Sequence, residues 1–277
     1  MAEALQRPTE NSLTRYLLIV DDLGTVQYTI EGLLSRHADV KSGRLAITAD
    51  QVTDPDDIPA AVERARETGT TYDLALVDLD FGARRVGGSQ SHGLTALRLL
   101  SQHTPDTKIA LYTADVEGNR ELMLRAAFEL FPLQQPQTWI SKASPADGQA
   151  EMICALLEGR DVPMGHLRPY LTRPEHLRLR SVCGTRTQLR IWQALALGLD
   201  SRTQIARQAG VSPSTLDKFV ANVREFILDC MPPLVPPEGA QAPGSNGRSA
   251  NLALAVRFAY ANRAFFSDPE LERLVSR

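Results

Sequence analysis

Five short apolar runs alternate with longer segments of helical periodicity between residues 15 and 159. The runs are YLLIV (16–20), RLAIT (44–48), LALVDL (74–79), KIALYT (108–113) and TWISK (138–142). Apolar runs of this length are typical of strands that are buried on both faces of a parallel sheet. The segments between and after them predict helices at 25–36, 58–68, 93–102, 119–130 and 145–158. This order predicts an α/β domain with a (βα)5 doubly wound parallel sheet.

A second pattern, with apolar residues at helical spacing, occupies residues 186–228. Its first helix is expected to end at Gly198, because glycine commonly follows the last turn of a helix. The residues expected on the buried face of that helix are Leu189, Trp192, Leu195 and Ala196.

Cap and turn residues divide the rest of this segment into two further helices. Ser201 and Gln204 have the spacing of a capping box, and Gly210 permits a tight turn. Ser212 and Pro213 then begin a third helix. Its inward-facing residues are predicted to be Leu216, Phe219, Val220 and Val223. Short helices joined by a glycine-containing turn predict an all-α helix-turn-helix domain.

Breaks in the two patterns set the expected domain boundaries. Pro and Arg interrupt residues 160–182, and a Pro/Gly-rich stretch follows the third helix. The expected order is a sheet domain at 15–159, a linker at 160–182, a helix-turn-helix domain at 183–230, a flexible linker at 231–249 and a helical extension at 250–277.

The extension at 250–277 has an apolar face that is expected to pack on the helix-turn-helix domain or to form a dimer seam. The residues of that face are Leu252, Leu254, Val256, Phe258, Phe265 and Phe266. Ser267 and Glu270 have capping-box spacing for a last short helix.

Charge separates the two predicted domains, although the net charge is only -3. Residues 1–165 hold 24 acidic and 15 basic residues, whereas residues 166–230 hold 5 acidic and 10 basic residues. Contact with a polyanion is therefore expected in the second domain. The three cysteines form no CxxC pair, and no apolar run approaches the length of about 20 residues that crosses a bilayer. A cytoplasmic protein without membrane insertion is predicted.

Polar residues close several of the predicted strands. Asp21 and Asp22 follow the first strand, Asp78 lies on the third, Thr113 ends the fourth and Lys142 follows the fifth. In open α/β sheets, ligands bind beyond the carboxyl ends of the strands. Converging carboxylates require a cation, and their oxygen atoms suit Mg2+ or Mn2+. Asp78 is then a candidate nucleophile for phosphoryl transfer, with Lys142 neutralising charge and the Thr113 hydroxyl contacting a phosphoryl oxygen.

The pieces LLIVDD, LALVDLD, IALYTA and WISK resemble the receiver domain of two-component response regulators. The resemblance implies that Asp78 is the phosphoacceptor, that Asp22 binds the metal directly and that Asp21 binds it partly through water. It also implies that Asp80 offers a backbone carbonyl to the metal. Two further residues acquire implied roles, Ala114 as a backbone N–H donor to the phosphoryl group and Trp139 as the aromatic switch residue.

Two alternatives arise from the segment around Asp78. The long loop FGARRVGGSQSHG and the unusual ELFPLQQPQ leave open, as an alternative, a phosphorylation-independent regulator whose receiver-like pocket senses a ligand or a partner protein. The spacing of Asp78 and Asp80 also resembles haloacid-dehalogenase-type phosphatases. In that family, however, the motif normally continues to Thr or Val where this chain has Gly82, and the acidic pair follows the Lys instead of preceding it.

The stretch GLDSRTQIARQAGVSPSTLDKFVANVRE resembles the LuxR-type output domain. Recognition helices enter the major groove near their N-termini. The expected DNA-contacting residues are Ser214, Thr215, Lys218, Asn222 and Arg224, with Arg202 and Arg207 as phosphate contacts. Asp217 departs from the family, where a basic or neutral residue is commoner, and either reads a cytosine amino group or weakens binding. The alternative is a helical protein-interaction domain.

Together the two resemblances imply a bacterial transcription regulator that acts as a switch and not as an enzyme. A partner histidine kinase would transfer a phosphoryl group to Asp78. A rearrangement through Thr113 and Trp139 would then change how the helix-turn-helix domain binds double-stranded DNA, as a homodimer.

Overall fold

The computed structural model describes residues 13–79, 81, 93–114, 119–131, 134–163, 179–199, 201–230 and 247–275. The chain divides into two compact units. The first contains Met1–Asp115 and Phe131–Leu171, and is called here the sheet unit. The second contains Val116–Leu130 and Thr172–Arg277, and is called the helical unit.

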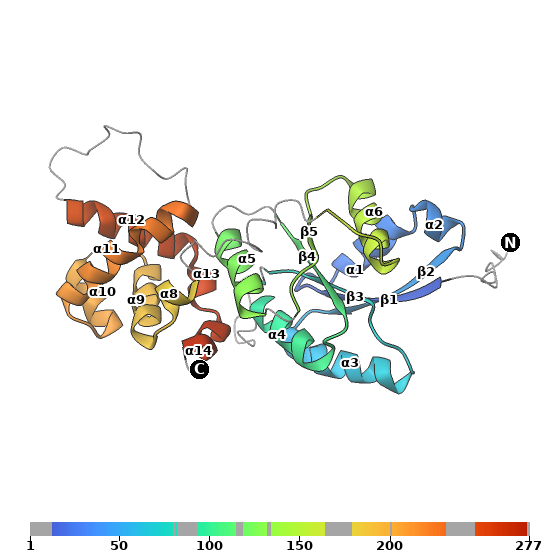
Figure 1. The fold of residues 1–277 in the computed structure, drawn as a ribbon, viewed down its shortest axis with the longest axis horizontal. Coiled ribbons are helices and arrows are strands. Elements are labelled where there is room, and N and C mark those ends of the chain that lie inside the picture. The colour runs from blue at the N-terminus through green and yellow to red at the C-terminus, as the bar shows by residue number, and fades with distance from the viewer. Residues whose placement is uncertain are drawn as a thin grey trace. The chain divides into compact units, whose positions relative to one another are not determined.

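The sheet unit is built on five parallel strands in the order β2-β1-β3-β4-β5 (Figure 1). The strands are β1 (Leu13–Val20), β2 (Leu45–Val52), β3 (Leu74–Val77), β4 (Lys108–Thr113) and β5 (Thr138–Ser141). Each lies at the apolar run that predicts it, and the predicted parallel (βα)5 sheet is confirmed. The order reverses between β1 and β3, which makes this pair the point where successive connections diverge.

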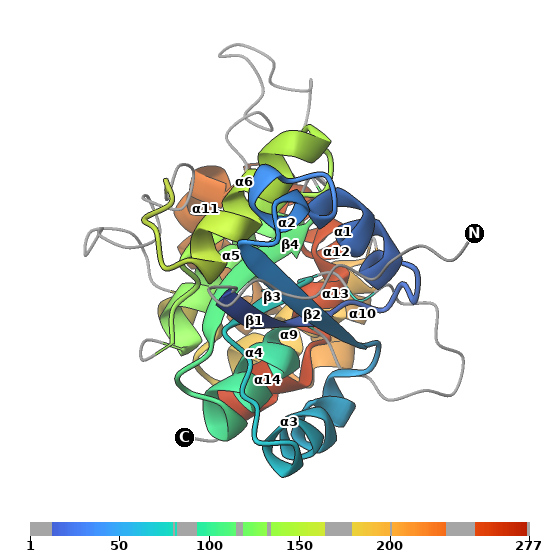
Figure 2. The ribbon, with the colours of Figure 1, turned by 90° about the vertical axis from the view of Figure 1, so that its right-hand side faces the viewer.

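Helices cover both faces of this sheet (Figures 1 and 2). One face carries α1 (Val26–Leu34) and α6 (Ala146–Leu157), and the other carries α3 (Ile58–Glu67) and α4 (Gly93–His103). Two short elements, α2 (Ala38–Lys41) and the 3-10 turn η1 (Pro55–Asp57), are absent from the sequence prediction. They are too short to produce a recognisable period.

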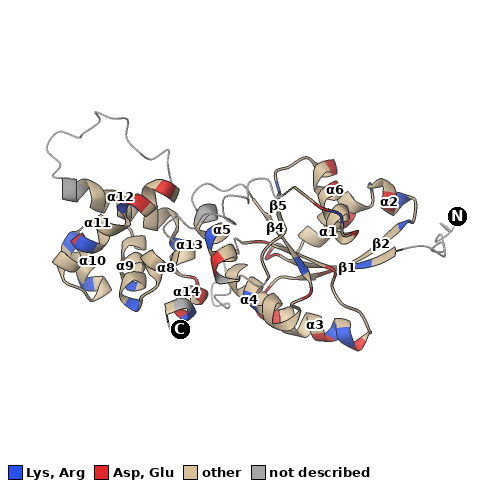
Figure 3. Ribbon diagram, viewed as in Figure 1, with Lys and Arg blue, Asp and Glu red and all other residues tan. Residues whose placement is uncertain are grey.

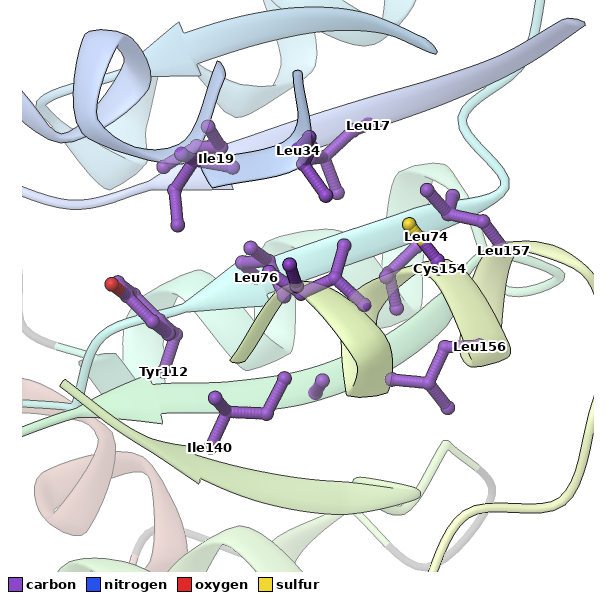
Figure 4. Close-up of a cluster of buried hydrophobic side chains, with 14 of the residues drawn as sticks. Leu17, Ile19, Leu34, Leu74, Leu76, Tyr112, Ile140, Cys154, Leu156 and Leu157 are labelled. Atoms are coloured by element: carbon purple, nitrogen blue, oxygen red, sulfur yellow. The ribbon is translucent and has the colours of Figure 1, made fainter. Parts of the chain in front are cut away.

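Alternate residues of the central strands bury their side chains beneath α1 and α6, as Figure 4 shows. Leu17 and Ile19 of β1 lie in this core beside Leu74 and Leu76 of β3. The neighbouring residues of both strands are also fully buried, which accounts for the unbroken apolar runs in the sequence. Packing on both faces fixes the strand register, and with it the position of each strand end.

Within its described residues, the helical unit contains helices and short turns, and no strand. They are α5 (Asn119–Leu130), α8 (Leu179–Cys183), α9 (Arg186–Ala196), α10 (Arg202–Ala209), α11 (Pro213–Cys230), α12 (Gly247–Ala261), α13 (Arg263–Phe266) and α14 (Pro269–Val275). The helix-turn-helix prediction corresponds to α9, α10 and α11.

The predicted turns and caps account for the ends of these helices. Gly198 and Gly210 have φ values of +68° and +65°, the left-handed region that glycine adopts without steric cost. The Ser212 hydroxyl accepts the Thr215 N–H at 3.1 Å at the start of α11. The predicted role of Ser267 at the last helix is wrong. The Asp268 carboxylate accepts the Glu270 N–H at 2.8 Å, and Ser267 instead ends α13.

An aromatic cluster forms the core of the helical unit. The Trp192 ring stacks on Phe266 with a centroid distance of 4.7 Å and meets Phe219 edge-on at 5.2 Å. The Trp192 indole donates a hydrogen bond to the Val182 carbonyl, so its polar atom is satisfied inside the core. Phe258 of α12 also contacts Trp192, at a centroid distance of 5.6 Å. The prediction that the C-terminal extension packs on the helix-turn-helix segment is confirmed.

None of the helices in the described ranges is long and apolar enough to cross a membrane.

The aromatic core predicts a large energetic difference between two truncations in the helical unit. Phe266→Ala removes a ring that is 1% exposed and stacked on Trp192, and we expect the free energy of unfolding to fall by about 3–5 kcal/mol. Leu197→Ala removes a side chain that is 57% exposed and should change it by less than about 0.5 kcal/mol. Urea unfolding followed by circular dichroism measures both. If the two variants lost similar amounts of unfolding free energy, Phe266 of the C-terminal extension would not be part of the core of the helical unit.

Candidate phosphoacceptor site and helix-turn-helix surface

Strand register brings Asp21 and Asp78 together at the carboxyl ends of the two central strands. Val20 of β1 pairs with Val77 of β3, so the next residue of each strand is an aspartate at the same level. Backbone hydrogen bonds hold both positions, from the Asp21 N–H to the Val52 carbonyl and from the Asp78 N–H to the Val20 carbonyl. The pair lies at the point where the strand order reverses, the usual ligand position in open α/β sheets.

Lys142 reaches this pair from the end of β5. Its backbone N–H donates to the Thr113 carbonyl at 3.0 Å and thereby continues the sheet by one residue beyond β5. Its Nζ atom lies 2.7 Å from the Asp21 Oδ2 atom and also donates a hydrogen bond to the Asp78 Oδ2 atom. One ammonium group therefore bridges two carboxylates from different strands.

Burial makes this bridge electrostatically necessary. Asp21 is 1% exposed and Asp78 is 5% exposed. Burial raises the pKa of Asp21 above its ordinary value, while the hydrogen bond from Lys142 opposes the shift. Burial alone would lower the pKa of Lys142, but the charges of Asp78 and Asp21 outweigh it and raise that pKa above 10.5. A raised lysine pKa stabilises the fold fully below pH 10.5, and that contribution is lost only as the pH rises through the folded-state pKa.

The carboxylates also fit a divalent cation. Asp21, Asp22 and Asp78 each offer one oxygen atom, and these atoms lie within 4.8 Å of one another. An all-oxygen donor set with several negative charges is the one that Mg2+ prefers. Asp80, the fourth predicted metal contact, lies outside the described residues. The three described aspartates could therefore hold Mg2+, and Lys142 already supplies positive charge at two of them.

The three remaining residues to which the receiver resemblance assigns roles lie at the end of β4 and in β5. Thr113 is the last residue of β4 and is 4% exposed, and Trp139 lies half-buried in β5, three residues before Lys142. Ala114 directly follows Thr113. The positions agree with the predicted order, and the roles of Thr113, Ala114 and Trp139 remain predictions.

The sequence does not predict the contacts of Tyr112 and Gln149 near Lys142. The Tyr112 hydroxyl donates to the Gln149 Oε1 atom at 2.9 Å, and the Gln149 amide donates to the Ser144 carbonyl at 2.7 Å. The Lys142 ammonium lies 5.6 Å from the centre of the Tyr112 ring, a cation–π distance. These residues come from β4 and α6, and nothing in their spacing along the chain indicates that they meet.

Gly93 is a second residue that sequence reasoning missed. A Cβ atom at Gly93 would lie 2.5 Å from the Leu79 Cα atom and 2.7 Å from the Asp78 carbonyl oxygen. The first residue of α4 therefore lies against the backbone of Asp78 and Leu79. Only glycine permits this approach without displacing one of the two segments.

The predicted DNA-contacting residues all lie exposed on the helix-turn-helix segment. On α11 they are Ser214, Thr215, Lys218, Asn222 and Arg224, and on α10 they are Arg202 and Arg207. Figure 3 marks the Lys and Arg positions on the ribbon in blue, including those on α9, α10 and α11. This exposure leaves them available to a ligand, and their contact with DNA remains a prediction.

Asp217 of α11 has a partner that its sequence position does not reveal. Its carboxylate accepts two hydrogen bonds from the Arg202 guanidinium, one of them from Nε at 2.7 Å. The pair joins α10 to α11 across the turn that contains Gly210. One predicted phosphate contact is thus engaged by an acidic residue of the same segment.

Comparison with solved structures finds neighbours of low sequence identity, among them three response-regulator structures. RcsB of Salmonella typhimurium is 15% identical, with a TM-score of 0.47 over 77% of this chain and 92% of that chain. RcsB of Salmonella enterica serovar Typhimurium, bound to a promoter with the phosphomimetic BeF3-, is 14% identical, with a TM-score of 0.44 over 87% and 98%. The response regulator ChrA of a heme-sensing two-component system is 17% identical, with a TM-score of 0.38 over 89% and 98%. No protein-family model and no curated protein sequence matches the chain.

The close approach of Gly93 to the backbone of Asp78 and Leu79 predicts that Gly93→Ala perturbs the candidate site. We expect a loss of about 1–3 kcal/mol in stability, because the added methyl group has to displace backbone atoms, and weaker binding of Mg2+ with beryllofluoride. Gly148→Ala on α6 is the matched control, since no atom lies within 4 Å of its added Cβ. Calorimetry of both variants provides the measurement. Unchanged ligand binding in Gly93→Ala would show that α4 does not constrain the pocket.

Removal of the bridging ammonium predicts a dependence on divalent cations. Lys142→Met leaves two buried carboxylates facing each other, and we expect a loss of about 3 kcal/mol at pH 7. Mg2+ should restore more stability to this variant than it adds to the wild type, because it replaces the missing charge. Lys142→Arg keeps the charge and should lose much less. Urea unfolding with and without Mg2+ tests this, and equal stabilisation of all three proteins would contradict it.

Proposed function

We propose that the chain is a bacterial, cytoplasmic response regulator in which phosphorylation of Asp78 controls DNA binding by the helix-turn-helix segment. The observation that carries the proposal is the bridge of Lys142 between Asp21 and Asp78, beside Asp22, at the carboxyl edge of the central strands. This arrangement gathers a nucleophilic carboxylate, a metal-binding pair of acids and a fixed positive charge within one buried pocket.

The pocket suits transfer of a phosphoryl group from a phosphohistidine of a partner kinase. An Asp78 carboxylate oxygen attacks the phosphorus atom, and the bond from phosphorus to the histidine nitrogen breaks. Lys142, which holds the same carboxylate before transfer, is positioned to hold a phosphoryl oxygen afterwards. Thr113 offers its hydroxyl at the end of β4. Mg2+, when bound by Asp21, Asp22 and Asp78, would neutralise charge on the transferred group.

The helix-turn-helix segment supports the second half of the proposal. Its α11 begins with a Ser212 cap and presents Ser214, Thr215, Lys218 and Asn222 on exposed positions. The stretch from 166 to 230 holds 10 basic and 5 acidic residues, which favours a polyanionic partner. Double-stranded DNA read by α11 is the ligand that fits, and homodimerisation would place two such helices on one site.

The experiment that tests the switch is phosphoryl uptake from acetyl phosphate with Mg2+. Asp78→Asn should abolish formation of the acid-stable, base-labile acyl phosphate, because the amide cannot act as the nucleophile. Asp73→Asn is the control, since Asp73 is a carboxylate of the same unit that pairs with Arg15 elsewhere. Equal labelling of Asp78→Asn and the wild type would refute the assignment. No labelling of any variant would favour a pocket that responds to a ligand or a partner protein.

The pair of Arg202 and Asp217 predicts the direction of a DNA-binding change. Asp217→Asn removes a negative charge from α11 and frees Arg202 for a phosphate, so we expect tighter binding and a salt dependence steeper by about one counterion. The double variant Arg202→Ala/Asp217→Asn should lose the steeper dependence. Gel-shift titrations over a series of salt concentrations provide the measurement. Weaker binding by Asp217→Asn would instead mean that Asp217 positions Arg202 or contacts a base.

A further inference from the structure

Helix α5 belongs to the helical unit, although the chain enters it from β4 and leaves it toward β5. In a (βα)5 alternation a helix in this place is a crossover of the sheet domain. Here residues 116–130 group with residues 172–277 instead. Figure 1 shows α5 beside α13, and the two helices are in contact.

An ion pair joins α5 to the C-terminal half of α11. The Arg125 Nη2 atom lies 2.7 Å from the Asp229 Oδ2 atom, and the guanidinium also lies 5.8 Å from the centre of the Phe226 ring. The Arg125 side chain is only 11% exposed. A largely desolvated arginine that pairs with a carboxylate and stacks on an aromatic ring is held more firmly than a surface ion pair.

A second polar contact joins α5 to the start of α8. The Glu129 Oε1 atom accepts the Leu179 N–H at 3.1 Å, one of the N–H groups that a helix cannot satisfy by itself. Negative charge at this helix start is also favourable toward the helix dipole. Apolar burial accompanies these contacts, because Leu122 and Ala126 of α5 are fully buried. Helix α5 is thus an integral part of the helical unit.

Because α5 belongs to the helical unit, the backbone crosses between the two units three times, near residues 115, 130 and 171. The first crossing begins directly at the candidate site, since Thr113 ends β4 and α5 begins at Asn119. The six residue steps from Thr113 to Asn119 span at most about 22 Å when fully extended, which limits how far the start of α5 can move from the end of β4. A change at the pocket edge therefore has a short covalent route to α5.

We propose that α5 is the element that couples the Asp78 pocket to the DNA-reading helix α11, and that Arg125 and Glu129 are the residues that hold it there. The proposal rests on the proposed function and adds the route of its regulation. On helix α11 the predicted DNA-contacting residues lie between Ser214 and Arg224, and the α5 contacts, Phe226 and Asp229, follow them in the last five residues. One rigid helix thereby links the docking of α5 to the reading of DNA.

The test compares DNA affinity with and without Mg2+ and beryllofluoride in the full-length chain. For the wild type we expect the ligand to change the dissociation constant by at least about fivefold, a usual size for coupling between two sites. Arg125→Glu replaces the ion pair with repulsion and should reduce the change to less than about twofold. The charge-exchanged variant Arg125→Glu/Asp229→Arg should regain the wild-type response. Calorimetry should show unchanged beryllofluoride binding in every variant.

Glu129→Gln provides an independent test, because it weakens the contact with α8 without placing a new charge in the helical unit. It should also reduce the response. Hydrogen exchange of the α8 and α11 amides gives a readout that needs no DNA: beryllofluoride should change it in the wild type and not in Arg125→Glu. A full response in both folded variants would overturn the role of α5 and leave the proposed function intact. A wild type that binds beryllofluoride without any effect on DNA or exchange would overturn both.

Discussion

The two carboxylates at the ends of β1 and β3 are the constraint on which the rest of the sheet unit depends. The parallel register sets Asp21 and Asp78 side by side, and burial removes the water that would otherwise separate their charges. Such a pair is tolerable only with a cation between the carboxylates. Lys142 supplies it from a third strand, and it is held in turn by the bond of its own backbone N–H to Thr113. Folding the sheet in this order therefore brings the three charged groups together.

The bridge of Lys142 between Asp21 and Asp78 also allows the charge in the pocket to change without loss of the fold. Lys142 neutralises the acids in the absence of another cation, so the fold does not need a metal to keep them together. A divalent ion or a phosphoryl group that enters the pocket changes the balance of charge among three strands at once. Gln149 of α6 accepts a hydrogen bond from the Tyr112 hydroxyl and donates one to the Lys142 carbonyl, so it links the lysine to β4 and α6. A change in charge at Asp78 can therefore shift side chains on β4, β5 and α6 together.

The strands and most helices are predictable from the sequence because burial on both faces of a parallel sheet leaves unbroken apolar runs. The order of Asp21, Asp78, Thr113 and Lys142 is predictable for the same reason, since each follows such a run. The brace of Tyr112 on Gln149 and the pair of Arg202 with Asp217 are not, because they join residues with no fixed spacing. Asp268 and Ser267 are adjacent cap-forming residues, and only the backbone geometry decides between them.

Helix α5 is an element whose existence the sequence predicts but whose packing partners it does not. Its position between two strands predicts the helix correctly but not its neighbours, because an apolar helix can be buried against any complementary surface. The charged residues of α5 have their partners in the helical unit: Arg125 pairs with a carboxylate of α11, and Glu129 accepts the first backbone N–H of α8. Those partners lie 104 and 50 residues further along the chain. A helix that is held by its polar contacts in one unit and tied by its chain ends to the other can transmit a displacement without any change in its own structure.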